Sequence, residues 1–386
     1  ADVDGDGFGD PAVSESACAE APGFRDGPWS VEAGDCDDDD PLVRPGGLEA
    51  CDGRDNDCQG GVDDVDGVAT TPGEVHATVE DGVIAALDEE VPLSLCAGVH
   101  EVPRVLVRAG ESLVVRGVGT SVTTLRGPPD GLFEVEGGTL TVARLTLTAP
   151  GGPVIEASSL AQIDVTDCVV DGSKVGLQLT GTTDAAVRGT VIRDNGAGGL
   201  DDGGVSVSQS ATLLVTGGEI VGNRGVDGGG LTVRGGQVNV VGTVVRDNEA
   251  TRGGGAYVER GAGLVLQEAQ LVGNRAVDGG GVWVDGMVDL LSTEVTDHLA
   301  TVGAGFFLTG GVVAVDGASV VKRNVASSRS GAAHLTGGRL AIDGADFGSG
   351  ADDNEPQDIQ SDDGTVDSAL GAVAFAECSN EGCSAP

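Results

Sequence analysis

The stretch at residues 222–233 reads Gly-Asn-Arg-Gly-Val-Asp-Gly-Gly-Gly-Leu-Thr-Val, and it decides the fold because it recurs. It returns as Asp-Asn-Glu-Ala-Thr-Arg-Gly-Gly-Gly-Ala-Tyr-Val at 247–258 and as Gly-Asn-Arg-Ala-Val-Asp-Gly-Gly-Gly-Val-Trp-Val at 273–284. A weaker copy follows at 297–308. Repetition at a nearly fixed period of this size is typical of a solenoid, in which each repeat packs on its neighbours.

One polar position marks each repeat and recurs every 24 to 30 residues. We expect its side chains to lie at a corner of each turn, in the left-handed backbone conformation that Asn tolerates. Stacked amides at such a corner can hydrogen-bond to one another along the solenoid. The position is occupied by Asn195, Asn223, Asn248, Asn274, His298, Asn324 and Asn354.

Within a repeat, short runs alternate apolar and polar residues and are rich in β-branched side chains, as at 231–233, 238–240 and 244–246. Such runs, separated by Gly, Asn or Asp, predict short strands, and none has the apolar period of a helix. The frame of a leucine-rich repeat is missing. The sequence therefore predicts an all-β fold, a right-handed parallel β-helix of about a dozen turns.

Charged residues recur in register with the repeats as well. One column should carry alternating signs and so form ion pairs between successive turns, which would also fix which turn stacks on which. Its members are Asp227, Arg252 and Asp278, and a second such column contains Arg224, Glu249 and Arg275.

Composition limits the possible partners. The formal net charge of −41 excludes ordinary nucleic-acid binding and argues against anionic membrane surfaces. No apolar run approaches the length of a transmembrane segment. Eight Cys in so acidic a chain lead us to expect a secreted, extracellular or cell-surface protein whose leader has been removed. The pairing of Cys18, Cys36, Cys51 and Cys58 is left open, as is a disulfide between Cys96 and Cys168.

Three domains are expected. Residues 1–70 form an acidic Cys-rich calcium-binding module, 71–375 the β-helix and 376–386 a loop closed by a disulfide between Cys378 and Cys383. Residues 1–66 hold 20 acidic residues against three Arg, with no convincing strand, so metal and disulfides must stabilise them. A short helix within 82–95 is expected to cap the open first turn.

Two loops of the N-terminal module have the spacing of calcium ligands, with carboxylates at alternate positions and Gly at the turn. The first loop lacks its final carboxylate, because that position is Val13, and the acidic run after it is the expected source. The first set of predicted ligands is Asp2, Asp4, Asp6, Phe8 through its carbonyl, Asp10, and Asp35, Asp37 and Asp39 from the acidic run. The second set is Asp55, Asp57, Gln59, Gly61, Asp63 and Asp66.

Residues 2–64 resemble the metal-binding repeat of secreted bacterial proteins that includes MopE, with matching segments at 2–10, 34–41, 45–46 and 49–58. They also look similar to thrombospondin type 3 calcium repeats. MopE is associated with copper bound by His and a modified Trp, but no His precedes His76 here. The resemblance therefore implies calcium as the cofactor and not copper.

The repeats across 190–336 resemble those of polymorphic outer-membrane adhesins, and the fold resembles pectate-lyase-like proteins. We therefore predict a structural protein, an adhesin or the subunit of a cell-surface assembly or filament, which associates with itself or with a surface or matrix partner. One alternative is a polysaccharide lyase or hydrolase, but Asp201, Asp202 and His334 lie several turns apart, and an enzyme is not expected. The other is a calcium-dependent binder of a glycan or protein.

Overall fold

The computed structural model describes residues 2–12, 32–65, 67–196, 202–349, 352–368, 377–379 and 382–384. The chain forms two compact units. The first comprises residues 1–100 and 113–124, and the second comprises 101–112 and 125–386. The domain boundaries predicted at 70 and 376 remain predictions. No helix in the described part of the chain is long and apolar enough to cross a membrane.

The first unit combines short strands with one helix. β1 and β2 pair in parallel, β3 pairs antiparallel with both β4 and β5, and β5 pairs in parallel with β8. Three of the strands cross between the units: β6 and β9 begin in the first unit and end in the second, and β8 begins in the second unit at Ser112 and continues in the first. The bounds are β1 Phe8–Gly9, β2 Glu32–Ala33, β3 Ala69–Thr71, β4 Glu74–His76, α1 Val79–Glu89, β5 Leu93–Leu95, β6 Gly98–Glu101, β8 Ser112–Gly117 and β9 Thr123–Arg126.

The helix expected within 82–95 forms as α1, but it starts earlier and ends sooner. Thr78 caps its N-terminus, because the Thr78 side chain accepts a hydrogen bond from the amide of Asp81. Its buried face includes Val83 and Gly82, whose Cα lies so close to Leu93 that a Cβ would come within 2.6 Å of that side chain. The helix ends at its C-cap Glu90, and strand β5 occupies residues 93–95 of the predicted range.

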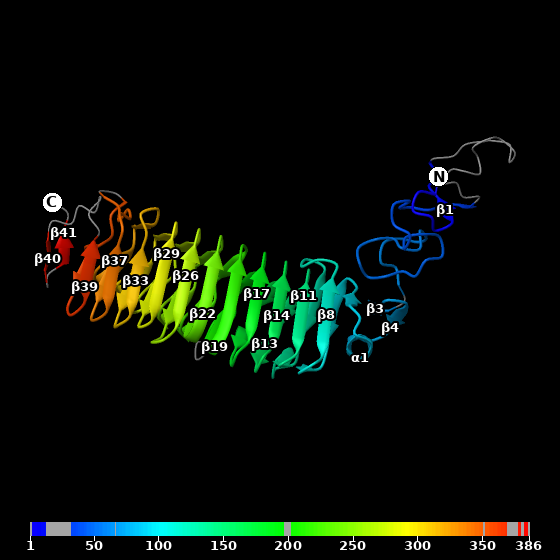
Figure 1. Cartoon of the computed structure of the whole chain (residues 1–386), viewed down its shortest axis with the longest axis horizontal. Coiled ribbons are helices and arrows are strands. Elements are labelled where there is room, and N and C mark those ends of the chain that lie inside the picture. Colours follow the sequence, from blue (N-terminus) through cyan, green and yellow to red (C-terminus); the bar gives the residue numbers. More distant parts are fainter. Residues whose placement is uncertain are drawn as a thin grey trace. The chain divides into compact units, whose positions relative to one another are not determined.

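The second unit is a parallel β-helix, as predicted, and the fold has about 13 turns. Most turns contribute strands to three faces, and Figure 1 shows the strands from β11 to β39 following one another along the solenoid. The first face contains β7 Val105–Arg108, β10 Phe133–Glu136, β13 Pro153–Ser158, β16 Val175–Leu179, β19 Val205–Thr216, β22 Leu231–Val241, β25 Ala256–Val258, β28 Val282–Val284, β32 Phe306–Leu308, β36 Ala333–Leu335 and β38 Ile359–Ser361.

The second face continues through the later halves of β19 and β22. Its other strands are β11 Thr139–Ala143, β14 Gln162–Thr166, β17 Asp184–Arg188, β26 Gly263–Gln267, β29 Met287–Leu291, β33 Val312–Val315, β37 Arg339–Ile342 and β39 Thr365–Ser368. The third face contains β12 Thr146–Thr148, β15 Val169–Asp171, β18 Val191–Arg193, β20 Glu219–Val221, β23 Val244–Arg246, β27 Gln270–Val272, β30 Glu294–Thr296 and β34 Val320–Lys322.

Two short extra sheets and a terminal hairpin complete the unit. β21 (Arg224–Asp227) pairs with β24 (Glu249–Arg252), and β31 (Leu299–Val302) pairs with β35 (Val325–Arg329), all in parallel. β40 (Glu377–Ser379) and β41 (Gly382–Ser384) pair antiparallel, with Cys378 opposite Cys383 along the backbone. The side chains of that hairpin lie outside the described residues, so the predicted disulfide there stays a prediction.

Register stacking builds a narrow apolar core. On the second face, Leu213 pairs with Val238, which pairs with Leu264, which in turn pairs with Val288. All four side chains are at most 2% exposed. Alternation within each strand sends the neighbouring residues outward, which is why short alternating runs encode this fold.

The predicted ladder of Asn side chains forms, and each of its members is buried. The Nδ2 of Asn223 donates to Oδ1 of Asn248 at 3.0 Å, and the Nδ2 of Asn248 donates to Oδ1 of Asn274 at 2.9 Å. His298 replaces an amide, and its Nδ1 accepts the backbone N–H of Asn274 at 3.0 Å.

One detail of that prediction is wrong. The left-handed residue is the one before the ladder position, as at Asp194, Asp247 and Asp297, with φ of 53°, 55° and 60°. The ladder residue itself needs a conformation that turns its amide into the core, where it also bonds a backbone carbonyl, as Asn248 does with Ile220.

The charge columns are in the predicted register. In the first column, Asp227 lies opposite Arg252, which lies opposite Asp278 of the next turn. In the second column, Arg224 lies opposite Glu249, which lies opposite Arg275. Nε and Nη2 of Arg252 each donate to one oxygen of Asp227 at 2.8 Å. Arg252 also lies over the rings of Tyr257 and Trp283, which stack with centroids 4.4 Å apart.

Candidate metal centre

Strand pairing brings the first predicted loop against the acidic run. β1 and β2 lie side by side, and the carbonyl of Gly9 accepts hydrogen bonds from the amides of Gly34 and Asp35 at 3.1 and 3.3 Å. Gly5 and Gly7 have φ of +84° and +102°, a backbone conformation that other residues rarely adopt. The loop can therefore turn between successive carboxylates.

Asp4, Asp6 and Asp35 form the best-defined group of the centre. Each uses Oδ1 to accept a backbone amide two residues further on, at 3.1, 2.8 and 2.9 Å respectively. One oxygen from each carboxylate lies within 4.8 Å of the others, and the Oδ2 of all three is buried without a hydrogen-bond partner among the described residues. Asp35 is only 2% exposed. Buried carboxylate oxygens that face one another without donors have the arrangement that a cation would satisfy.

The electrostatics of this group agree with that interpretation. Burial raises the pKa of Asp35, and the carboxylates of Asp6, Asp4 and Asp38 raise it further. The pKa of Asp4 is raised by the same two causes, burial first and then its acidic neighbours. A bound divalent cation would remove this repulsion and favour the ionised carboxylates.

A second group consists of Asp2, Asp4 and Asp38, so it shares Asp4 with the first. Oδ1 of Asp2 accepts the amide of Gly5 at 2.8 Å, and Oδ1 of Asp38 accepts the amide of Val3 at 3.1 Å. Asp38 was not among the predicted ligands. The run of four Asp at 37–40 indicated that one of them would contribute, but the sequence does not show which of them faces the loop.

The remaining candidates of the first loop lie outside both groups. Oδ1 of Asp10 accepts the amide of Ala12 at 2.7 Å, and Asp37 lies 4.0 Å from the guanidinium of Arg54. Asp10, Asp37 and Asp39 line a cavity beside the groups. Phe8 donates its amide to Asp6, and its carbonyl remains a predicted ligand.

In the second loop, Asp57 comes together with two residues that were not predicted, Glu49 and Asp64. The Glu49 carboxylate accepts the amides of Asp57 and Asp63, each at 3.0 Å, which fixes its position. Burial raises the pKa of Glu49. Glu49 precedes the loop by six residues, so a template for one continuous loop could not identify it.

Other predicted ligands of this loop stabilise the backbone. Asp55 and Asp57 both accept the amide of Gln59, at 3.1 and 2.8 Å. Asp63 accepts the amides of Asp52 and Gly53, at 2.8 and 2.9 Å. Gly61 is half-buried and belongs to none of the three groups, and Asp66 lies outside the described residues.

Two disulfides hold these segments together. Cys36 pairs with Cys58, so the bond joins the residues next to Asp35 and Asp57. Cys51 pairs with Cys96. The open question about Cys96 and Cys168 is thereby answered, because Cys168 is a buried thiol whose pKa burial raises to about 11. The side chain of Cys18 lies outside the described residues.

Comparison with known families supports both parts of this description. Residues 35–64 match the family described as "Putative metal-binding motif", named for MopE. Residues 130–294 match the "Right handed beta helix region" family, which also gives the hand of the solenoid.

Comparisons with individual proteins add little. Among solved structures, the A-module of Azotobacter vinelandii mannuronan C-5 epimerase AlgE6 is similar, at a TM-score of 0.38 and 14% identity, over 72% of this chain and 92% of that chain. Comparison with curated protein sequences gives no match.

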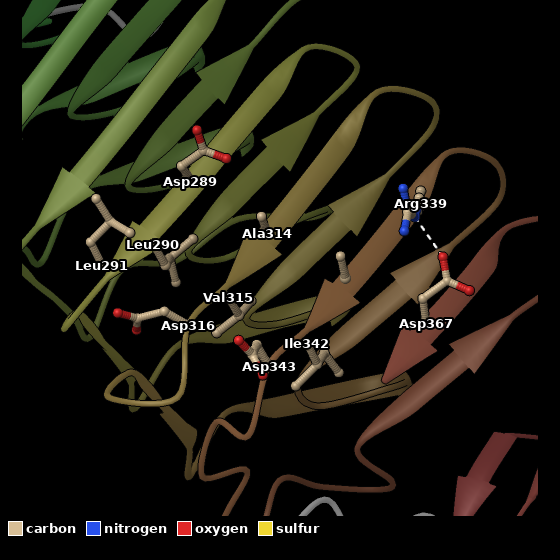
Figure 2. A pocket seen from close by; sticks show the side chains of 11 residues that line it. Asp289, Leu290, Leu291, Ala314, Val315, Asp316, Arg339, Ile342, Asp343 and Asp367 are labelled. Carbon is tan, nitrogen blue, oxygen red and sulfur yellow. Dashed lines mark hydrogen bonds and ion pairs between the residues drawn. The ribbon is translucent and has the colours of Figure 1, made fainter. Parts of the chain in front are cut away.

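A cavity of about 540 Å³ on the β-helix is lined by four carboxylates, so it is a second conceivable place for a cation. Figure 2 shows them spread around its rim, with Arg339 bonded to one of them, Asp367, at 2.5 Å. No group of three convergent metal-capable side chains among the described residues includes them, and all three such groups lie within residues 2–64. The metal-binding motif and the loop before it are therefore the candidate metal centre.

Proposed function

We propose that this protein is a secreted, extracellular structural protein in which calcium orders an N-terminal acidic module attached to a β-helix. Its role would be that of an adhesin or of a subunit in a cell-surface assembly. The observation that carries the calcium proposal is the set of three buried, unpartnered Oδ2 atoms of Asp4, Asp6 and Asp35.

The donor chemistry favours calcium over other metals. The three groups offer only carboxylate oxygens, which suit hard cations such as calcium and magnesium. Calcium accepts six to eight oxygens in flexible geometry, so neighbouring main-chain carbonyls and waters can complete an irregular set. No His occurs before His76, so the imidazole ligands associated with copper are not available in this module.

Calcium would also explain how the module folds. Among the described residues of 2–65, only Val43 and Cys51 belong to the buried apolar core. So small a core cannot offset the conformational entropy lost on folding. Metal binding linked to folding, together with the disulfides, supplies the missing stability.

A structural role is supported by the way the β-helix uses its charges. A lyase would need a basic side chain to take a proton from its substrate, but Arg252 is bonded through two nitrogens to Asp227, which favours its charged form. His334 is 1% exposed and packs on the ring of Phe307, and Asp202 is bonded to Ser206 and Arg234. Asp227, Arg252, Asp202, Arg234 and Ser206 thus satisfy one another. The Nε2 of His334 lies 3.4 Å from a carboxylate oxygen of Asp362, while its Nδ1 is buried without a hydrogen-bond partner among the described residues. The expectation that the chain is not an enzyme remains part of this proposal.

Electron microscopy and sedimentation, each in calcium and in chelator, test the assembly role. We expect calcium to promote association of the protein into larger particles or attachment through the N-terminal module. A protein that stays monomeric in both conditions and binds no surface would contradict the structural role, while leaving calcium uptake by the isolated sites to be measured separately.

A further inference from the structure

A cavity of about 540 Å³ lies on the outer surface of the first face, entirely within the second unit. Gln178 of β16 pairs with Ser206 of β19, while the flanking residues Leu177, Leu179 and Val207 are fully buried. Strand alternation therefore sends Gln178 and Ser206 outward into the cavity. Its volume falls in the range of about 300–1,000 Å³ that is common for small-molecule sites.

The wall of the cavity is formed by the edge of an extra sheet. β21 pairs with β24 and contributes Val226 and Asp227 to the lining. Ser208 and Arg234, further along β19 and β22, line it as well. The cavity thus combines outward-facing strand residues with the flank of a second layer.

Its charged groups are held in place by one another. Arg234 forms ion pairs with Asp202 and, at 3.3 Å, with Asp227. Asp227 is also bonded to Arg252 through two nitrogens, and Asp202 accepts the hydroxyl of Ser206 at 2.7 Å. The side chains of Asp202 and Asp227 are only 16% and 12% exposed. A polar site of this kind is fixed before a ligand arrives, which reduces the entropy lost on binding.

The net charge of the lining is unusual for this protein. Lys174 and Arg234 balance Asp202 and Asp227, so the formal charge of the lining is zero in a chain that carries −41. The cavity of Figure 2, by contrast, has four carboxylates and one Arg. A neutral, pre-paired lining gives no net attraction for an anion or a cation.

We propose that this cavity binds a neutral saccharide. The amide of Gln178 and the hydroxyl of Ser208 can both donate to and accept from sugar hydroxyls, and the oriented carboxylate oxygens can accept from them. Pro153 and Val175 provide apolar surface in the same cavity for the C–H face of a sugar ring. Acidic sugars are disfavoured, because the surrounding protein is strongly acidic.

This inference goes beyond the proposed function and does not depend on the metal centre, which lies in the other unit. The test uses the whole chain in calcium. Isothermal titration calorimetry and saturation-transfer NMR would compare neutral oligosaccharides of glucose, xylose and N-acetylglucosamine with oligogalacturonate. We expect at least one neutral series to bind and oligogalacturonate not to compete.

Two variants locate the site. Gln178→Ala and Ser208→Ala each remove one side-chain hydrogen-bonding group that has no partner among the described residues, and each should weaken saccharide binding by about 3–10-fold. Gln270→Ala is the matched control, because Gln270 is exposed on the third face, away from the cavity, and it should leave the affinity unchanged. No binding of any neutral series, preference for oligogalacturonate, or equal loss in the control would overturn the proposal.

Discussion

Replacement of Asp35 by Asn tests the candidate metal centre at its most buried candidate ligand. The variant keeps an oxygen for the amide of Asp37, which Oδ1 accepts at 2.9 Å, so the local turn should persist. It removes the negative charge of Asp35 from the group that this residue forms with Asp4 and Asp6. Asp35 is only 2% exposed. Calcium affinity should therefore fall without loss of the fold.

The size of the effect follows from simple electrostatics. A carboxylate oxygen ~2.4 Å from a divalent ion contributes about 3.5 kcal/mol even at the dielectric constant of water. An amide oxygen and water recover part of this, so we expect affinity to fall roughly 10–100-fold. For a site with a dissociation constant of ~0.1 mM, ~2 mM calcium stabilises the folded module by about 1.8 kcal/mol, and a 30-fold weaker site retains about 0.3 kcal/mol.

The assay is calcium titration by calorimetry, followed by thermal unfolding in calcium and in chelator. Asp88→Asn is the matched control, because it removes the same charge in the same unit from an exposed residue of α1, outside the groups and outside the predicted ligands. Wild type and Asp88→Asn should behave alike, and Asp35→Asn should lose most of its calcium-dependent stabilisation. Equal behaviour of the two variants, or no calcium uptake by the wild type, would refute the reasoning.

Three further predictions concern the β-helix. Arg252→Ala leaves Asp227 with Arg234 as its one remaining ion-pair partner. The loss of stability in thermal unfolding should be on the order of 1 kcal/mol, because the pair is partly exposed. Release of unsaturated uronides by the wild type, abolished in this variant, would contradict the structural role. Asn248→Ala breaks the buried ladder on both sides, and denaturant titration should show a loss of about 2–4 kcal/mol; a loss below 1 kcal/mol would count against the ladder. Burial lowers the pKa of His298 to about 4, from 6.5 in a model compound. Below pH 6.5 the unfolded chain therefore binds a proton that the folded chain does not, and stability is lost as the pH falls towards 4. His298→Asn should remove this part of the loss, about 2 kcal/mol, when unfolding is compared at pH 7 and 4.5. An unchanged pH dependence would show that His298 is not its source.

The fold could be predicted because its determinants are local and repeated. Alternation places Val238 and Leu264 in the core, and the period places Asn223 under Asn248. Both follow from spacing alone, without knowledge of distant contacts. From the sequence, the left-handed conformation is expected at the Asn itself, whereas in the structure the residue before it adopts that conformation. This preceding position holds Asp247 in one repeat and Gly273 in another, and the spacing of the repeats does not show which of two adjacent residues is left-handed.

The candidate metal centre was harder to predict because its ligands come from separate segments. Asp2, Asp4 and Asp6 follow a local loop spacing, so the sequence alone placed them among the candidates. Asp38 and Glu49 join the groups only through chain reversals that strand pairing and hydrogen bonds to the backbone impose. In the structure, Asp63 accepts hydrogen bonds from the backbone amides of Asp52 and Gly53. The spacing of the loop alone does not predict this use of the side chain.

Hydrogen exchange, measured peptide by peptide in calcium and after chelation, tests the central claim most directly. The account predicts that chelation removes amide protection across residues 2–12 and 32–65, where carboxylates bond the backbone and apolar burial is scarce. Strands β10 to β39, which pair with neighbouring turns, should keep their protection. Unchanged protection of the N-terminal segments on chelation, or loss of protection along the whole β-helix, would contradict a calcium-ordered module on an independently stable solenoid.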